Sequence, residues 1–175
     1  MRQCLLYDSV DKNARLIGIE YMITPKLYST FDTEERTLWH SHVFEVKSGM
    51  LIMPQNTALV PQAAWEKAET TEMEGIVELY GKVYHLWQVD KGHKAPLGKP
   101  QLMTSLTAPG QIDFETVVGE RDKKFQSDWR RKKEIRAHIQ EPQVHPGEFP
   151  SPFNSFTRNP NCLDADAAWR KTTAR

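Results

Sequence analysis

The chain has 175 residues, of which 39% are hydrophobic, and this is enough to form the core of one globular domain. The 23 Lys and Arg residues balance 23 Asp and Glu residues, so no net charge draws the chain toward nucleic acid or a membrane surface. No apolar run approaches the ~20 residues that a transmembrane helix needs, and the first residues are too polar for a secretory signal. We therefore expect an intracellular protein that has no transmembrane segment and does not bind nucleic acid.

The first predicted element is an antiparallel β-hairpin. Residues 2–8 form a short apolar strand, and residues 14–24 alternate between an apolar face and a second face that carries Glu20. The five polar residues 9–13 between them have the length of a hairpin loop. We expect Glu20 on the polar face of the second strand, and a turn of helix after Pro25.

A central helix is predicted next, over residues 32–48. Asp32 followed by Glu35 is typical of a helix N-terminus, because both carboxylates can accept hydrogen bonds from backbone amides that have no partner at the helix start. Apolar residues then recur at helical spacing, and Ser48-Gly49 supplies a stop. An extended strand that carries His40 and His42 on one face, as in a cupin-like metal site, is the alternative.

The remaining elements alternate between helix and strand. Residues 50–53 are a buried strand or an extended connection, and residues 62–80 form a helix with Gly81 at its C-terminal cap. Strands follow at 82–89 and 101–107. The fold class is therefore α+β, with an antiparallel sheet of four to five strands and two main helices packed on one face.

The C-terminal part differs in composition. Residues 122–139 are expected to form a charged helix, with Phe125 and Trp129 four residues apart. Its basic side chains either form a solvated face or meet an anionic lipid surface. We expect a single α+β domain over residues 1–140 and a proline-rich, partly disordered tail over 141–175. The two cysteines, Cys4 and Cys162, are expected to be free thiols.

The stretch 39–49 contains the densest group of reactive side chains. His40, His42 and Glu45, joined by His85 from the strand 82–89, offer the nitrogen and oxygen atoms that zinc or iron accepts. The alternative interpretation places the histidines in the core as neutral imidazoles that bond to Glu20, Glu45 or Gln88. The spacing alone favours the second interpretation.

Acid–base catalysis has candidates but no diagnostic motif. A catalytic carboxylate or imidazole needs a pKa that burial or a neighbour has shifted. The candidate side chains are His42, His85, Glu45, Glu20 and Asp90. A salt bridge to Arg15 or Lys47 explains the carboxylates equally well. A Gly-x-Ser-x-Gly turn and a glycine-rich phosphate loop are absent from the sequence, so no reaction is identified.

Several motifs occur together, in the order Arg2-Gln3-Cys4, Asn13-Ala14-Arg15-Leu16-Ile17-Gly18, Trp39-His40-Ser41-His42, Tyr80-Gly81-Lys82 and Pro96-Leu97-Gly98. In order and spacing, from Arg2 to about Pro146, the chain resembles the oil-body-associated protein family. Plant members associate with seed oil bodies, and no reaction or agreed active site comes with the family. Members usually carry a His- and Cys-containing stretch ahead of the Arg2 position, so the resemblance implies an N-terminally short member whose polar site is incomplete if that stretch contributes to it.

The resemblance implies a cytoplasmic protein that binds peripherally at lipid droplets or to an associated protein, with no required cofactor. We expect its binding centre to consist of Trp39, His40, His42, Glu45, Lys47, Tyr84, His85 and Trp87. The alternative is an enzyme that acts on a small hydrophobic metabolite, with His42 and His85 as acid–base groups or as ligands of zinc or iron. The oligomeric state is not specified by the sequence.

Overall fold

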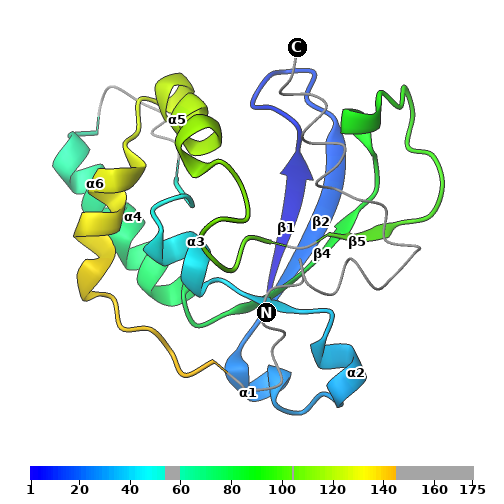
Figure 1. Cartoon of the computed structure of the whole chain (residues 1–175), viewed down its shortest axis with the longest axis horizontal. Coiled ribbons are helices and arrows are strands. Elements are labelled where there is room, and N and C mark those ends of the chain that lie inside the picture. The colour runs from blue at the N-terminus through cyan, green and yellow to red at the C-terminus, as the bar shows by residue number, and fades with distance from the viewer. Residues whose placement is uncertain (54–59, 104, 145–175) are drawn as a thin grey trace. The chain divides into compact units, whose positions relative to one another are not determined.

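A computed structural model describes residues 1–53, 60–103 and 105–144 (Figure 1). Its contacts divide these residues into two compact units. The first unit contains Met1–His40 and Gly81–Ser105, and the second contains Ser41–Tyr80 and Leu106–Pro146 as far as they are described. The single domain over residues 1–140 stays a prediction. Residues 145–175, which make up most of the predicted proline-rich tail, lie outside the described residues.

Within the described residues, five strands form one open antiparallel sheet. They are β1 (Arg2–Tyr7), β2 (Leu16–Ile23), β3 (His40–Ser41), β4 (Tyr80–His85) and β5 (Gln101–Met103). The order is β1-β2-β4-β3, and β5 also pairs with β4. The predicted hairpin is confirmed, with Cys4 opposite Glu20 and Leu5 opposite Ile19. Together with the helices, this sheet confirms the predicted α+β class.

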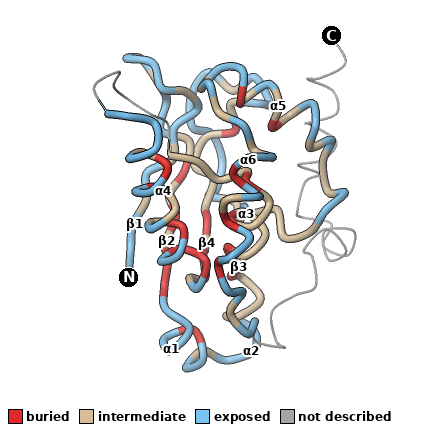
Figure 2. The backbone as a smooth tube through the Cα atoms, turned by 90° about the vertical axis from the view of Figure 1, so that its left-hand side faces the viewer, coloured by how far each residue is buried: buried red, intermediate tan, exposed pale blue. Residues whose placement is uncertain are grey.

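The face of β2 that the sequence predicted to be polar is the more deeply buried one. Gly18, Glu20 and Met22 are buried, whereas the apolar residues Ile17, Ile19 and Tyr21 are only partly buried. Figure 2 shows the buried stretches of β2 and β4 in red. A side chain at Gly18 would place its Cβ 2.6 Å from the carbonyl oxygen of Tyr84, so only glycine fits there. Glu20 therefore lies on a buried face of β2, which is the face that the sequence predicted to be the polar one.

The predicted central helix over residues 32–48 is also wrong, although both of its ends are right. Asp32 accepts a hydrogen bond from the Glu35 amide at 2.8 Å and begins α2 (Thr33–Arg36). The chain then leaves the helix, forms β3 at the edge of the sheet, and begins α3 (Val43–Lys47). Gly49, with φ of 81°, follows the Ser48 cap as predicted. Residues 40 and 41 pair with β4, and this pairing satisfies their backbone hydrogen bonds in an extended conformation. The local periodicity of the sequence favours a helix because it does not detect contacts with a distant strand.

The other first-unit helices are short. α1 (Pro25–Tyr28) has Pro25 in its first turn, and Thr24 accepts a hydrogen bond from the Leu27 amide. The predicted strand 82–89 is shorter in the structure, because β4 ends at His85 and a 3₁₀ turn, η1 (Val89–Lys91), begins at Val89.

The second unit is helical. Besides α3, it contains α4 (Gln62–Ile76), α5 (Phe114–Phe125), α6 (Trp129–Ile135) and the 3₁₀ turn η2 (Arg136–His138). Its core consists of Val46, Met73, Ile76, Val77 and Ile139. The predicted charged helix 122–139 is interrupted, because Gln126 adopts φ of 52° and ends α5. α4 ends earlier than predicted, and Gly81 belongs to β4 rather than to a helix cap.

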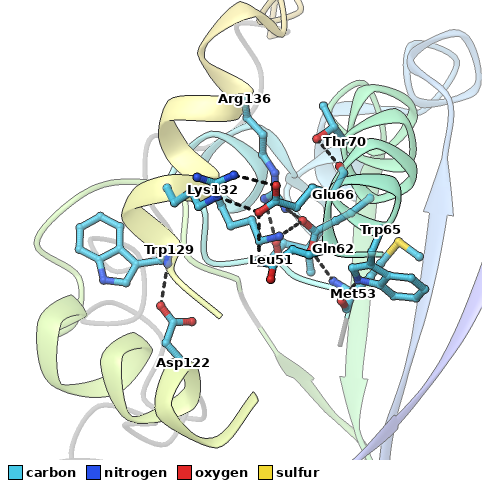
Figure 3. A network of polar contacts seen from close by, with 12 residues as sticks. Leu51, Met53, Gln62, Trp65, Glu66, Thr70, Asp122, Trp129, Lys132 and Arg136 are labelled. Carbon is cyan, nitrogen blue, oxygen red and sulfur yellow. Dashed lines mark hydrogen bonds and ion pairs between the residues drawn. The ribbon is translucent and has the colours of Figure 1, made fainter. Parts of the chain in front are cut away.

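A buried network of charges joins α4 to α6 (Figure 3). The Glu69 carboxylate lies 2.6 Å from the Lys132 ammonium and 3.2 Å from the Arg136 guanidinium. Arg136 also donates hydrogen bonds to the carbonyl oxygens of Val46 and Leu51. Burial lowers the pKa of Arg136, and the negative charge of Glu69 opposes that shift.

The basic segment is therefore only partly a solvated face. Arg130 pairs with Glu115, and Arg131 pairs with Glu66, in addition to the buried pairs of Lys132 and Arg136. Most cations of the basic segment thus already form ion pairs with carboxylates of the second unit, and these pairs compete with binding to an anionic surface. None of the described helices is both long enough and apolar enough to cross a membrane.

Candidate functional site

Glu20 and His40 form a buried pair in the first unit. Glu20 lies on the buried face of β2, and His40 is the first residue of β3. The Nε2 atom of His40 is 3.5 Å from the Oε1 atom of Glu20, and their side chains are 6% and 11% exposed. This pair brings together a carboxylate and an imidazole that the sequence places 20 residues apart.

Cys4 lies beside this pair, directly opposite Glu20 in the register of β1 and β2. Burial raises the pKa of the Cys4 thiol, and the negative charge of Glu20 raises it further. A nucleophilic cysteine needs the opposite shift, because the thiolate is the reactive form. Cys4 is a free thiol, as predicted, in an environment that disfavours the thiolate.

His42 and Glu45 form the corresponding pair in the second unit. His42 is 1% exposed and precedes α3, and its Nε2 atom lies 3.9 Å from the Oε2 atom of Glu45. The Nδ1 atom is 2.9 Å from the carbonyl oxygen of Leu79. A carbonyl oxygen only accepts, so we assign the proton to Nδ1 and the lone pair to Nε2. In this tautomer Nε2 is the ring nitrogen that can accept a proton or a hydrogen bond.

His85 has different partners. Its Nδ1 atom lies 3.2 Å from the side-chain oxygen of Gln88, as the core interpretation expects. Its Nε2 atom is buried and makes no hydrogen bond within the described part of the chain. Asp90, the last acid–base candidate, is exposed in η1.

The predicted binding residues Trp39 and Tyr84 contact a cation of the chain itself. The Lys82 ammonium lies 5.6 Å from the Trp39 ring centroid and 5.7 Å from that of Tyr84. It also forms a 2.7 Å ion pair with Glu35, which accepts a hydrogen bond from the Trp39 indole. The hydrogen bond from Lys82 is the largest cause of the lowered pKa of Glu35. Sequence reasoning missed the ion pair between Lys82 and Glu35. The four-residue spacing of Glu35 and Trp39 could have indicated only the hydrogen bond between those two side chains.

Trp87 and Lys47 are likewise engaged within their own units. The Trp87 indole donates to the His93 carbonyl, and the Arg15 guanidinium lies 5.4 Å from the Trp87 ring centroid. The Lys47 ammonium donates to three carbonyl oxygens around η2, those of Arg136, Ala137 and Ile139. These contacts stabilise the fold, and the binding role predicted for the two residues stays a prediction.

Two of the hollows of the molecule are lined by described residues of the second unit. One, of about 620 Å³, lies between α5 and α6 and is lined by residues that include Asp122, Trp129 and Arg130. The other, of about 120 Å³, is lined by residues that include Trp65, Glu69 and Phe125. Neither is lined by a candidate catalytic residue, so neither supports the enzyme alternative.

Exposed apolar side chains gather on the hairpin of the first unit. Leu5 is 63%, Tyr7 50%, Val10 67% and Leu16 39% exposed, and we call these four residues the hairpin patch. Tyr7 lies opposite Leu16 in the register, and Val10 lies in the loop between the strands. The hairpin also carries the exposed cations Arg2, Lys12 and Arg15. Sequence reasoning placed Leu5, Tyr7 and Leu16 on strands and Val10 in the loop. It did not detect the exposure of the strand residues, which depends on what covers each face of the sheet.

Residues 1–140 match the family described as "Protein of unknown function (DUF1264)", and the chain belongs to this family. Its relatives include Oil body-associated protein 1B of Arabidopsis thaliana, 43% identical over 148 residues, and Oil body-associated protein 1A of Zea mays, 39% identical over 150 residues. Each alignment covers 83% of this chain and 58% of the relative, so the chain spans little more than half the length of these relatives. No solved structure matches the chain. The resemblance inferred from the motifs is confirmed.

Proposed function

We propose that this protein associates with the surface of oil bodies as a peripheral binding protein and that the hairpin patch is its lipid contact. The proposal rests on one observation, the concentration of exposed apolar side chains on a single hairpin in a chain whose relatives are named oil body-associated proteins. Soluble monomers seldom expose such a group of side chains unless it contacts a partner.

The residue types of the patch suit the boundary between lipid and water. Full burial of one Leu or Val side chain contributes about 1.5–3 kcal/mol. Only part of this free energy is gained on binding to lipid, because the side chains of the patch are already partly buried in the free protein. A tyrosine carries an apolar ring with a polar end, which suits the headgroup level. Several such side chains give a reversible association, which differs from the insertion of a membrane-spanning helix.

The exposed charges of the hairpin favour an anionic surface slightly. The exposed cations are Arg2, Lys12 and Arg15 and the exposed carboxylates are Asp8 and Asp11, whereas Glu20 is buried. The Arg15 guanidinium is 2.6 Å from Asp8, and hydrogen bonds from the Arg15 backbone and side chain lower the pKa of Asp8. A basic residue near an anionic lipid surface contributes about 1 kcal/mol, so apolar contact is the larger contribution here.

Flotation with artificial oil bodies tests the proposal. Triolein droplets coated with phosphatidylcholine and a minority of phosphatidylserine are mixed with the purified full chain and centrifuged. The double variant Leu5→Ser/Val10→Ser should lower the partition into the floating layer about tenfold or more, because two apolar contacts are lost.

Leu97→Ser is the matched control, since Leu97 is 57% exposed but lies in the loop before β5. It should float like the unchanged protein. Failure of the unchanged protein to float, or an equal loss in the Leu97 variant, would contradict the hairpin patch as the lipid contact.

A further inference from the structure

We propose that β1 pairs with β1 of a second copy of this chain, so that two sheets join into one continuous sheet in a symmetric dimer. β1 lies at an edge of its sheet, because β2 is the only described strand that pairs with it (Figure 1). Its residues Arg2, Gln3, Leu5 and Tyr7 are exposed. The pairing needs no lipid, so this proposal goes beyond the proposed function.

Alternate residues of β1 direct their backbone groups to the free edge. The Asp8 amide donates to the Arg15 carbonyl, so Asp8 faces the other strand of the hairpin. In β2, the Ile17 carbonyl accepts from the Leu86 amide, which lies directly after β4. Backbone groups alternate in direction along a strand, so the even-numbered residues of β1 and β2 face each other. The odd-numbered residues of β1 therefore present an N–H donor and a C=O acceptor on the side away from β2.

The free edge lacks the usual features that prevent strand pairing. Native proteins block such edges with charged side chains, a proline or a bulge in the edge strand. Residues 3–7 contain no charged residue and no proline. The register shift between Leu6 and Tyr7 passes over Ile17, so the extra residue belongs to β2 and β1 stays regular. β1 is therefore suited to accept a further strand.

The sequence of β1 is complementary to itself in one antiparallel register, with a two-fold axis at Leu5. Leu5 then lies opposite the partner's Leu5, and Gln3 lies opposite the partner's Tyr7, so the outward backbone groups of β1 are paired. Arg2 lies opposite the partner's Asp8, and the two-fold axis repeats this pair of opposite charges. An axis moved by one residue in either direction would place Arg2 opposite an uncharged side chain. The charges therefore favour a second copy as the occupant of this edge.

The dimer has a consequence for lipid binding that, unlike the pairing itself, rests on the proposed function. Residues opposite each other in a strand pair point to the same face, so both hairpin patches lie on one side of the joined sheet. Both patches can then contact one droplet surface, and a bivalent contact is stronger than a single one. One strand pair is a small interface, below the ~1,200–2,000 Å² that stable complexes bury. We therefore expect a dimer that forms and dissociates with concentration.

Sedimentation equilibrium of the purified full chain without lipid, from about 1 μM to about 1 mM, tests the pairing. We expect the mass to rise from that of one chain toward that of two. Gln3→Pro removes an outward N–H group and no bond to β2, so β1 should still form. It should weaken dimerisation about tenfold or more, because the two-fold axis removes two hydrogen bonds at once. Gln3→Ala keeps the backbone amide and is the matched control, which should dimerise like the unchanged protein.

Disulfide cross-linking with copper phenanthroline tests the register. In a Cys4→Ser/Cys162→Ser background, Leu5→Cys should bring two thiols opposite each other, with Cα atoms about 5.5 Å apart, which a disulfide can bridge. Gln3→Cys is the control on the same face of β1. Its two copies should lie four residues apart along the strands, about 14 Å, which is too far for a disulfide. The Leu5 variant should therefore form covalent dimers and the Gln3 variant should not.

The mass of one chain at every concentration would overturn the proposal. Equal dimerisation of Gln3→Pro and Gln3→Ala, or equal cross-linking at positions 3 and 5, would also overturn it. If Gln3→Pro does not fold, as judged by circular dichroism, the cross-linking pattern decides. A dimer that does not float would contradict the lipid contact alone, and a monomer that floats would contradict the strand pairing alone.

Discussion

Glu69 of α4 and Lys132 of α6 form a 2.6 Å ion pair although their side chains are only 1% and 10% exposed. Glu69 also lies against Arg136, and it accepts a hydrogen bond from the Met53 amide at 2.9 Å. One carboxylate thus balances two buried cations and binds the backbone at Met53. The network is asymmetric, because losing the single anion leaves both cations uncompensated.

Glu69→Gln should therefore destabilise the second unit strongly. Removing one partner of a buried ion pair typically costs about 3–5 kcal/mol, since the remaining charge stays in a poorly solvated position. Urea unfolding followed by circular dichroism measures the change. The matched control is Glu74→Gln, which breaks the exposed pair with His138 and should cost less than about 1 kcal/mol. Equal costs in the two variants would mean that the Glu69 network contributes nothing beyond a surface pair.

Gly49→Ala should destabilise far more than the same change at Gly92. Both glycines have positive φ, 81° and 76°, so both substitutions carry the backbone cost of about 1 kcal/mol that a left-handed residue incurs. A Cβ at Gly49 would also collide with the backbone carbonyl of Trp129, whereas nothing lies within 4 Å of one at Gly92. We expect a loss of several degrees in melting temperature for Gly49→Ala beyond that of Gly92→Ala. Similar melting temperatures would show that α6 moves away from Gly49 without cost.

Glu35 should contribute stability that acid removes. The hydrogen bond from Lys82 lowers the pKa of Glu35, so the folded state binds the proton less tightly than the unfolded chain. Its contribution is complete above the ordinary glutamate pKa of about 4.3 and is lost as the pH falls through the lowered value. Because the Glu35 side chain is 35% exposed, the effect should stay below about 1 kcal/mol.

A double-mutant cycle measures this contribution. Glu35→Gln should flatten the acid limb of the stability curve in the unchanged protein and have little effect in a Lys82→Met background. The same loss in both backgrounds would assign the effect to a partner other than Lys82.

Local chemistry predicted some elements of this protein well. Asp32 caps a helix and Pro25 begins one, because each acts on backbone groups within a few residues. The hairpin followed from alternation and a short polar loop. Each of these features is encoded by neighbours in the chain, which is the range that a pattern can detect.

The other elements depend on contacts between distant segments. His40 and Ser41 form a strand because the sheet accepts them beside β4, although the flanking residues favour a helix. The Glu69 pairs link residues more than 60 positions apart, so the basic segment looked solvated in the sequence. The pairing of Glu20 with His40 was missed for the same reason, since the alternation of β2 shows only that Glu20 lies on its polar face and not what covers that face.

Cys4 should report the charge of Glu20. Burial is the larger cause of the raised pKa of the Cys4 thiol and the Glu20 charge the second, so a neutral side chain at position 20 should lower that pKa part of the way. In a Cys162→Ser background, Cys4 should react with iodoacetamide near neutral pH more slowly than a model thiol, because little thiolate is present.

Adding Glu20→Gln should speed the reaction and shift its pH profile toward lower pH. Asp11→Asn, which neutralises an exposed carboxylate in the hairpin loop, serves as the control and should leave the profile in place. A profile that is identical with and without the Glu20 charge would show that burial alone sets the reactivity of this thiol.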